Sequence, residues 1–572
     1  MTRCITALES EKNRAKVLMA FSVALLVIAL TPILALVPFN HPVCWDDFNA
    51  LAELQKSPAA FSYGQRFSSQ FCNTLFYPPL KDFSLDTMMK IVHNHRIFAF
   101  LYIILFVASF FFMVFELNRT VIKAEPPVFL CIFSASLFLL LNFINLSSTL
   151  FYCMPAATGY TGGVIFMFLF LALLLRHHFC ASGKEKIICD ALLFIVTFIL
   201  SGFIEIFVLF AGFIAFYVFL FAKNPLSKKR DITYAGLFAF TILIFSSFFI
   251  VNKGMIAAKY DQKAQRTEAS PSTQKPIASM LPATKTISIL AQNFVQLTVQ
   301  TSAQSQPTKK SSTAKSFFQK NSSFFYRLGP WCKYNAKFVK QEIRKIVSFH
   351  NLPLMLFLFW ILEKTPLKKT RVTIKTLFLI ALLYPVILLM SLSGCYSGLS
   401  WFTLYVTVRN VFDVIFWLVT TTLLYALLKF AQQFVAATIS LEFIPAHLDF
   451  TKAAAFALLA ISLGLTSFGS EKYLVGVAWH DVLSGKAKKY DQIQSENYRT
   501  IFDSEESLVT LKYPGFPRAL VNFQGNYIKF DSTDNTLYVS KEVVRFFKKH
   551  EIVYAYDELP SERDVYTQEK RR

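Results

Sequence analysis

Long uninterrupted apolar runs, separated by short polar segments, repeat along most of this chain. Most are about 17–22 residues long, the length that an α-helix needs to cross the hydrocarbon core of a bilayer. The strands of a membrane β-barrel would alternate between apolar and polar residues instead. The pattern predicts an all-α polytopic membrane protein with about 11 spans. These are residues 17–37, 97–115, 128–144, 160–175, two within 187–222, 232–251, 352–362, 376–392, 411–428 and 453–468.

One apolar run, residues 187–222, is too long for a single span. Basic residues flank it on both sides, with Lys184 and Lys186 before it and residues 228–230 after it. Since basic flanks favour the cytoplasm, the segment has to cross the membrane an even number of times. Ser201-Gly202 is the natural turn, and it places Glu205 at the outer membrane face.

The basic residues before the first span place the N-terminus in the cytoplasm, and eleven crossings place the C-terminus outside. The first run is too long for the apolar part of a signal peptide, which indicates an uncleaved span. Two domains follow: a transmembrane domain over residues 1–470 and an α+β extracytoplasmic region over 471–572. The first includes outer loop 38–95 and basic outer loop 252–351, where residues 333–348 predict an amphipathic helix on the membrane surface. Short strands at 508–512, 519–523 and 527–530 and a helix at 541–549 are expected in the second.

Composition agrees with the hydropathy pattern: 54% of the residues are hydrophobic and only 16% are charged, against about 25% charged in soluble proteins. The net charge of +22 is explained by Lys and Arg flanking the spans and by the basic loop, so no nucleic-acid partner is expected. Nine cysteines form no Cys-x-x-Cys pair. A zinc or iron–sulfur centre is therefore not expected.

Two adjacent carboxylates, Asp46 and Asp47, follow the first span between Trp45 and Phe48. Shielding by aromatic side chains, and the charge of each carboxylate on the other, raise the pKa of such a pair. A carboxylate so placed serves as a catalytic base or a metal ligand. The alternative interpretation is a solvated turn or a helix cap.

Several further motifs occur in order along the chain. They are Tyr63-Gly64-Gln65-Arg66-Phe67 before the second span, Phe151 to Pro155 and Tyr160 between spans three and four, Gly202-Phe203-Ile204-Glu205, Asn252-Lys253-Gly254, and Arg409 before a late span. Together with the Asp pair, this order resembles the GT-C superfamily of integral-membrane glycosyltransferases, and in particular an uncharacterised bacterial branch of it. The extra Gln65 and the Asn252-Lys253-Gly254 element depart from the pattern of that branch.

The resemblance implies a GT-C-like fold in the bacterial cytoplasmic (inner) membrane and an inverting transfer of sugar from a polyprenyl-phosphate donor. The acceptor would be a cell-envelope glycan, lipid or protein at the extracytoplasmic face, and membrane lipids would be further partners. No cofactor is certain, although a divalent cation such as Mg²⁺ or Mn²⁺ is compatible with the carboxylates. The implied catalytic residues are Asp46, Asp47 and Glu205, and the implied substrate-binding residues are Arg409, Arg66, Lys253, Tyr152, Tyr160 and Tyr396.

Two other functions compete with a transferase: a polytopic transporter or lipid flippase, and a non-catalytic membrane scaffold. A transporter is expected to carry charges inside its spans and an internal repeat. The spans are nearly free of charge, with Asp190 and Asp413 among the exceptions. The spacing of Asp413 from Arg409 allows a pair within one helical turn.

Overall fold

The computed structural model describes residues 11–42, 47–48, 51, 67–77, 84–144, 148–179, 183–222, 231–247, 339–345, 348, 351–363, 365–369, 371–385, 406–438, 473–521, 528–531, 536–539 and 541–555. All of them belong to one compact unit, formed by Met1–Val251 and Phe338–Arg572. The second unit, Asn252–Lys337, lies outside the described residues, and most of the predicted basic loop falls there.

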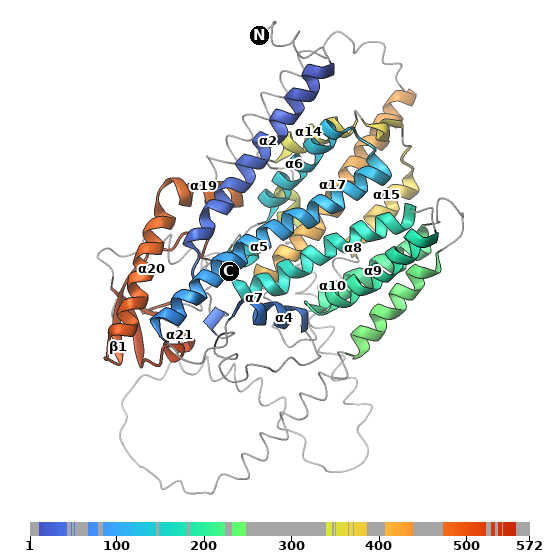
Figure 1. Cartoon of the computed structure of the whole chain (residues 1–572). Coiled ribbons are helices and arrows are strands. Elements are labelled where there is room, and N and C mark those ends of the chain that lie inside the picture. Colours follow the sequence, from blue (N-terminus) through green and yellow to red (C-terminus); the bar gives the residue numbers. More distant parts are fainter. Residues whose placement is uncertain are drawn as a thin grey trace, which may run out of the picture. The chain divides into compact units, whose positions relative to one another are not determined.

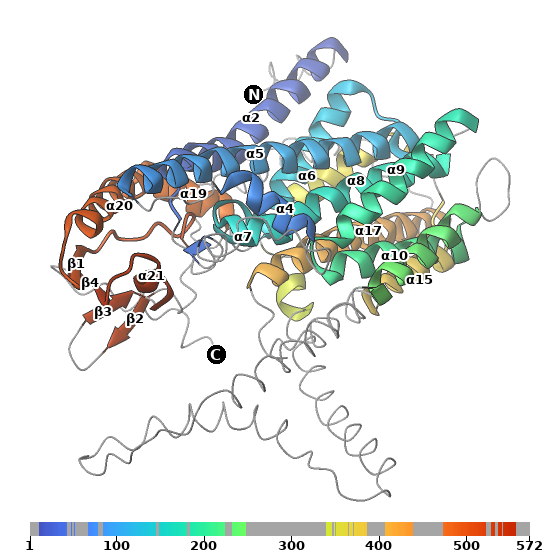
Figure 2. The same ribbon diagram turned by 60° about the horizontal axis from the view of Figure 1, so that its bottom comes forward.

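Five helical segments of the described chain are long and apolar enough to cross a membrane. They belong to α2 (Glu11–Leu36), α5 (Leu85–Leu117), α6 (Pro126–Phe143), α7 and α8 (Met154–Ala156 and Gly162–Phe179) and α17 (Val406–Thr438). Helix α2 packs against α6 and α5 packs against α8 (Figures 1 and 2). Exposed apolar side chains such as Val23, Val27 and Leu105 cover their outer faces. This is an all-α membrane protein with a small sheet.

Shorter apolar helices complete the helical part. They are Ile206–Phe221, Ile232–Ser247, Leu352–Leu362 (α14), Ile374–Pro385 and Leu474–Leu483. Most of them coincide with predicted spans, but they are too short to count as crossings by length alone. The predicted span at residues 453–468 lies outside the described residues.

The long apolar run folds into two helices, α9 (Gly183–Ser201) and α10 (Glu205–Phe221), which confirms the predicted break at Ser201-Gly202. A side chain at Gly202 would collide with Phe67 and Ser68, which pack directly against this turn. The hairpin therefore needs glycine where its turn meets the rest of the protein.

Helix α5 begins at Leu85, well before the predicted span at residue 97. Ser84 caps it, because the Ser84 hydroxyl accepts a hydrogen bond from the Thr87 N–H at 3.3 Å. A further helix, α4 (Phe67–Phe76), also lies within the segment predicted as an outer loop. Residues 38–95 are thus partly helical, and His95 and Arg96 project from α5 rather than from a loop.

Charged side chains join α8 and α9 at the end of α8 that carries His177. The His177 Nδ1 atom lies 2.8 Å from Asp190 Oδ1, and its Nε2 atom lies 3.2 Å from Asp231 Oδ2. Lys186 Nζ donates to the same Asp231 oxygen at 2.6 Å. Burial favours the protonated form of Asp231, but Lys186, the Thr233 N–H and His177 outweigh it and lower the pKa of Asp231 to about 2.

The C-terminal region combines two helices with a four-stranded sheet. Its elements are α19 (Leu474–Leu483), α20 (Lys486–Asp503), β1 (Leu508–Lys512), β2 (Ile528–Asp531), β3 (Thr536–Val539), α21 (Lys541–Phe546) and β4 (Glu551–Ala555). The strand order is β1-β4-β3-β2, with β1 parallel to β4 and the other pairs antiparallel. The predicted strand at 508–512 is confirmed, whereas Ala519 and Leu520 form a turn instead of the predicted strand.

Strand β1 is an edge strand, and a side chain covers part of its free edge. Asn497 on α20 donates from Nδ2 to the Lys512 carbonyl at 2.9 Å, and its Oδ1 accepts from the Lys512 N–H at 3.0 Å. The amide group thereby replaces the backbone of a neighbouring strand at this residue.

The apolar helix α19 packs along α2 and α6. The indole N–H of Trp479 donates to the Ile28 carbonyl of α2 at 3.0 Å. Pro32, four residues further along α2, has no N–H and so cannot bond that carbonyl. Trp479 therefore supplies the hydrogen-bond donor that the Ile28 carbonyl lacks within α2.

Candidate functional site

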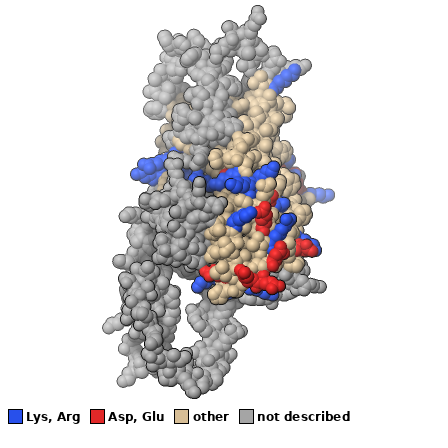
Figure 3. Space-filling view, turned by 90° about the vertical axis from the view of Figure 1, so that its left-hand side faces the viewer, with Lys and Arg blue, Asp and Glu red and all other residues tan. Residues whose placement is uncertain are grey.

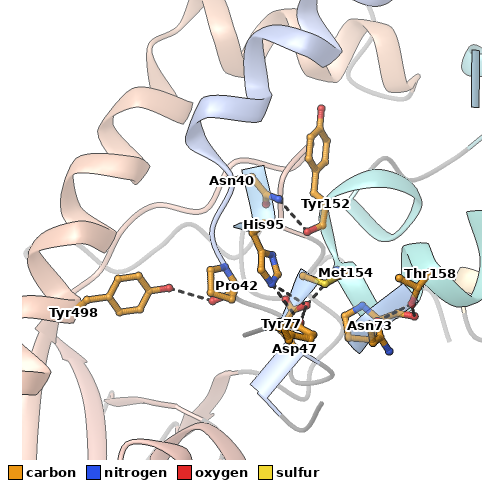
Figure 4. A network of polar contacts seen from close by, with 11 residues as sticks. Asn40, Pro42, Asp47, Asn73, Tyr77, His95, Tyr152, Met154, Thr158 and Tyr498 are labelled. Atoms are coloured by element: carbon orange, nitrogen blue, oxygen red, sulfur yellow. Dashed lines mark hydrogen bonds and ion pairs between the residues drawn. The ribbon is translucent and has the colours of Figure 1, made fainter. Parts of the chain in front are cut away.

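The segment that follows α2 leads into the Asp pair, and three distant elements hold it. Asn40 donates from Nδ2 to the Tyr152 carbonyl at 3.2 Å, and the Asn40 carbonyl accepts from Arg96 Nε of α5 at 3.4 Å. The Pro42 carbonyl accepts from the Tyr498 hydroxyl of α20 at 3.1 Å (Figure 4). These contacts fix the backbone at Asn40 and at Pro42, which lies four residues before Asp46 in the sequence.

Asp47 is almost fully buried, with 1% of its surface exposed. Its Oδ1 accepts hydrogen bonds from the Tyr77 hydroxyl and from the Met154 N–H, each at 3.2 Å (Figure 4). His95 Nε2 lies 3.8 Å from the same oxygen and 3.3 Å from the Tyr77 oxygen. Since a buried carboxylate needs such donors, these contacts explain why Asp47 is tolerated inside the protein.

A second polar group, formed by His41, Arg96 and Asp491, involves the same segment through His41. Asp491 Oδ1 lies 2.7 Å from His41 Nε2 and 2.6 Å from an Arg96 guanidinium nitrogen. Burial lowers the pKa of the His41 imidazole more than Asp491 raises it. Burial alone would raise the pKa of Asp491, but His41 and Arg96 hold it below its ordinary value. At neutral pH the group is a neutral imidazole beside a charged Arg–carboxylate pair.

The turn between α6 and α8 lies at the centre of these contacts. It comprises η3 (Ser148–Tyr152), α7 and η4 (Ala157–Thr161). Thr158 donates from its hydroxyl to Asn73 Oδ1 of α4 at 2.9 Å, and its Oγ1 lies 3.2 Å from the Ser69 hydroxyl. The Tyr152 hydroxyl donates to the Ile33 carbonyl near the end of α2 at 2.6 Å. The turn therefore connects α2, α4 and the segment that carries Asp47.

The α9–α10 hairpin meets α4 at the same end of the bundle. The Gly202 carbonyl accepts from the Ser68 N–H at 2.9 Å and the Ser69 N–H at 3.4 Å. The Ser68 hydroxyl donates to the Ile199 carbonyl at 2.7 Å. The hairpin thus caps the first N–H groups of α4, which have no partner within their own helix. Two motifs recognised separately in the sequence, residues 63–67 and 202–205, therefore adjoin at Phe67 and Gly202.

Helix α17, whose first turn carries Arg409, contacts both η3 and η4. Asp413, for which the spacing allowed a pair with Arg409, has its Oδ2 3.4 Å from Lys345 Nζ. Lys345 also pairs with Glu342 at 2.8 Å, and the Glu342 side chain is fully buried. Residues 339–345 are helical, as predicted, but this buried ion pair fixes them to α6 and α17.

The predicted site residues fall into three groups. Asp47, Tyr152 and Tyr160 are described with their side chains, and all three lie in or against the α6–α8 turn. Glu205 begins α10 and Arg409 lies in the first turn of α17, while their side chains lie outside the described part of the chain. The remaining predicted residues, Asp46, Arg66, Lys253 and Tyr396, lie outside the described residues altogether.

The sequence did not indicate the residues whose contacts hold the segment between α2 and Asp47 in place. They are His41, Tyr77, Asp491 and Tyr498. Asp491 and Tyr498 sit on an ordinary polar helix, and no local pattern links them to the first loop. Within the described ranges, no group of three or more His, Cys, Asp or Glu side chains is arranged to hold a metal ion.

Comparison with protein-family models, with curated proteins and with solved structures gives no match to this chain.

Proposed function

We propose that this protein is an inverting glycosyltransferase of the GT-C type, acting on a polyprenyl-phosphate sugar at the extracytoplasmic face of a bacterial cytoplasmic membrane. One observation carries the proposal. Asp47, the beginning of α4, the α9–α10 hairpin and helix α17 all contact the α6–α8 turn or each other. In the proposal, Asp46, Glu205 and Arg409 act together at this turn, at one end of an apolar helix bundle.

The reaction is a single displacement. An acceptor hydroxyl oxygen attacks the anomeric carbon of the donor, and the bond from that carbon to the phosphate oxygen breaks. Polyprenyl phosphate leaves with the bonding electron pair, the configuration at the anomeric carbon inverts, and a carboxylate takes the acceptor proton. Cationic side chains are needed for the departing phosphate, whose negative charge grows as the bond breaks. In the proposal, Arg409, Arg66 and Lys253 fill this role.

The buried contacts of Asp47 suggest different roles for Asp46 and Asp47. Its Oδ1 already accepts from Tyr77 and Met154, and its side chain is buried. In the proposal, Asp47 therefore fixes the segment and the adjacent Asp46 is the base. Tyr152 likewise uses its hydroxyl to hold the Ile33 carbonyl. Tyr160 and Tyr396 then remain as aromatic side chains for the sugar, and Glu205 for acceptor orientation or a divalent cation.

The test uses purified protein in nanodiscs with a panel of polyprenyl-phosphate-linked glucose, mannose, galactose and N-acetylglucosamine, and with detergent-extracted envelope as acceptor. The readout is released polyprenyl phosphate, which is common to every donor. We expect release by the wild type, and a loss of about 100-fold or more in Asp46→Asn, as for removal of a general base. Asp47→Asn keeps an oxygen that accepts from Tyr77 and Met154, so we expect it to lose less.

Thermal unfolding of each variant serves as the control for correct folding. Release that persists at wild-type rate in a folded Asp46→Asn variant would contradict the assigned base. No release from any of the four donors by the wild type would contradict the proposed function itself.

Transport is the second candidate, because α17 carries two buried charges within a potential span. Asp413 pairs with Lys345, and Lys429 pairs with Glu363 at 3.2 Å. The two charges are sixteen residues apart, or about 24 Å at 1.5 Å per residue, so they lie near opposite ends of the span. Two charges so far apart do not form a continuous path of charged groups through the span, which favours the transferase. Lipid flipping with no sugar transfer in the nanodisc assay would support the second candidate.

A further inference from the structure

The corner between α19 and α20 exposes apolar and basic side chains side by side. Leu483, the last residue of α19, is 66% exposed, and the ring of Trp479 is partly exposed. Lys488 and Lys489 are exposed in the first turn of α20, and Lys486 is half-exposed. We call these five residues the α19–α20 corner.

Contacts within the protein set the position of this corner relative to a bilayer. Trp479 bonds to the Ile28 carbonyl, and Ile28 lies in a segment long and apolar enough to span a membrane. From Ile28 to the end of α2 at Leu36 is eight residues, or about 12 Å along the helix. Helix α19 therefore lies beside the last turns of a helix long enough to span a membrane, and α20, which follows α19, contacts His41, five residues beyond the end of α2.

Charge is separated along α20 and the residues after it. The basic residues Lys486, Lys488 and Lys489 lie at the end next to α19. Exposed acidic residues lie at the far end: Glu496, Asp503, Glu505 and Glu506. Figure 3, which faces this side of the molecule, shows a band of basic side chains and, below it, most of the acidic ones together with further basic ones. The three lysines thus gather at the end of α20 next to α19, while the far end carries these acidic residues together with the exposed Arg499.

We propose that the α19–α20 corner binds the anionic headgroups of the membrane lipids that surround the protein. Lysine ammonium groups attract lipid phosphate, and their apolar stems extend along the surface toward it. Trp and Leu beside them match the interfacial zone, where one part of a side chain is apolar and the other is wet. This inference does not depend on the proposed transferase activity.

A lipid surface fits these observations better than another protein. The exposed apolar residues of α2, Val23 and Val27, belong to a segment that spans the membrane, and the α19–α20 corner continues from the helix packed against it. A protein partner would have to displace lipid from that position. The corner also combines the two features that define interfacial membrane binding, an exposed apolar side chain and adjacent basic residues.

The test is hydrogen–deuterium exchange of the full-length protein in nanodiscs, one set made of phosphatidylcholine alone and one containing half phosphatidylglycerol. We expect amides of residues 483–490 to exchange at least about threefold more slowly with the anionic lipid, since each lysine near an anionic surface contributes about fivefold in binding. The double variant Lys488→Gln/Lys489→Gln should lose this difference between the two lipids.

Arg499→Gln is the matched control, because Arg499 is exposed on the same helix but lies eleven residues beyond Lys488. We expect this variant to keep the full lipid dependence. Equal exchange of residues 483–490 in both lipids would overturn the proposal. Equal loss of the difference in Arg499→Gln would overturn it as well, because the effect would then report net charge rather than the α19–α20 corner.

Discussion

Trp479 donates its indole N–H to the Ile28 carbonyl, which Pro32 leaves without a partner inside α2. The two residues are far apart in the sequence, and their contact joins the C-terminal region to the first spanning helix. The end of α2 in turn leads into the segment that carries Asp46 and Asp47. Packing of α19 therefore fixes the first helix close to the candidate site.

A double-mutant cycle tests this relationship. Trp479→Phe leaves the Ile28 carbonyl buried without a donor, which we expect to lower the free energy of unfolding by about 1–2 kcal/mol. Pro32→Ala supplies a backbone N–H four residues after Ile28. In the Pro32→Ala background, Trp479→Phe should therefore cost about 1 kcal/mol less. Thermal unfolding in detergent measures all four proteins, and equal costs in both backgrounds would argue against the hydrogen bond.

Acidification should weaken the contact between α20 and the segment that follows α2, which carries His41. Burial lowers the pKa of His41 below 6.5, its ordinary value, so the unfolded chain binds a proton more readily than the folded one. The stability gained from neutral His41 is present above pH 6.5 and is lost as pH falls through the lower folded pKa. The lowered pKa of Asp491 acts in the same direction, but only below about pH 4.

We therefore expect the thermal midpoint of the wild type to fall between pH 7.5 and pH 5.5, and to fall less in His41→Gln. His93→Gln is the control, since His93 is exposed on α5, the helix that carries Arg96. An equal fall in all three proteins would show that another group accounts for the acid sensitivity.

Removal of the Asp47 carboxylate should destabilise the protein through the donors that it leaves behind. Asp47→Ala leaves the Tyr77 hydroxyl and the Met154 N–H without their acceptor, which we expect to cost about 2–4 kcal/mol. Tyr77→Phe removes only one donor and should cost about 1 kcal/mol. Combined with Asp47→Ala, Tyr77→Phe should add little. Chemical or thermal unfolding of the set checks this order.

Close packing of α8 against α10 predicts a strong effect of one methyl group. A Cβ atom on Gly163 would overlap the buried ring of Phe207, so Gly163→Ala forces the ring or the helix to move. We expect a loss of about 1–3 kcal/mol in the free energy of unfolding. Gly183→Ala is the matched control because an added Cβ at Gly183 meets nothing within 4 Å. Similar unfolding midpoints for the two variants would contradict the packing described here.

The features that sequence predicted best are those determined by nearby residues. Hydropathy located the five helices that are long and apolar enough to span a membrane, and Ser201-Gly202 marked the hairpin turn, because length and a glycine are local signals. The strand at 508–512 was visible from its alternation. Helix α20 was not predicted, because most of its residues are polar and only a few side chains on one face are buried. The early start of α5 was missed because Leu85 to Arg96 are too polar to read as part of a span.

The candidate site was predictable only in part, because only some of its residues lie in recognisable local motifs. Asp47, Tyr152 and Tyr160 stood out because they lie in short motifs next to spans. The contact of His41 with Asp491 joins residues 450 positions apart, and nothing in the local sequence of either one indicates it. Such a contact follows from the packing of α19 and α20, which hydropathy cannot specify.

The side-chain amide of Asn497, bonded to both backbone groups of Lys512, has a consequence for self-association. A strand added from a second molecule along β1 would have to break both bonds and move α20 aside. Sheet-to-sheet polymerisation, the common failure of exposed β edges, is thereby opposed on that side of the C-terminal region.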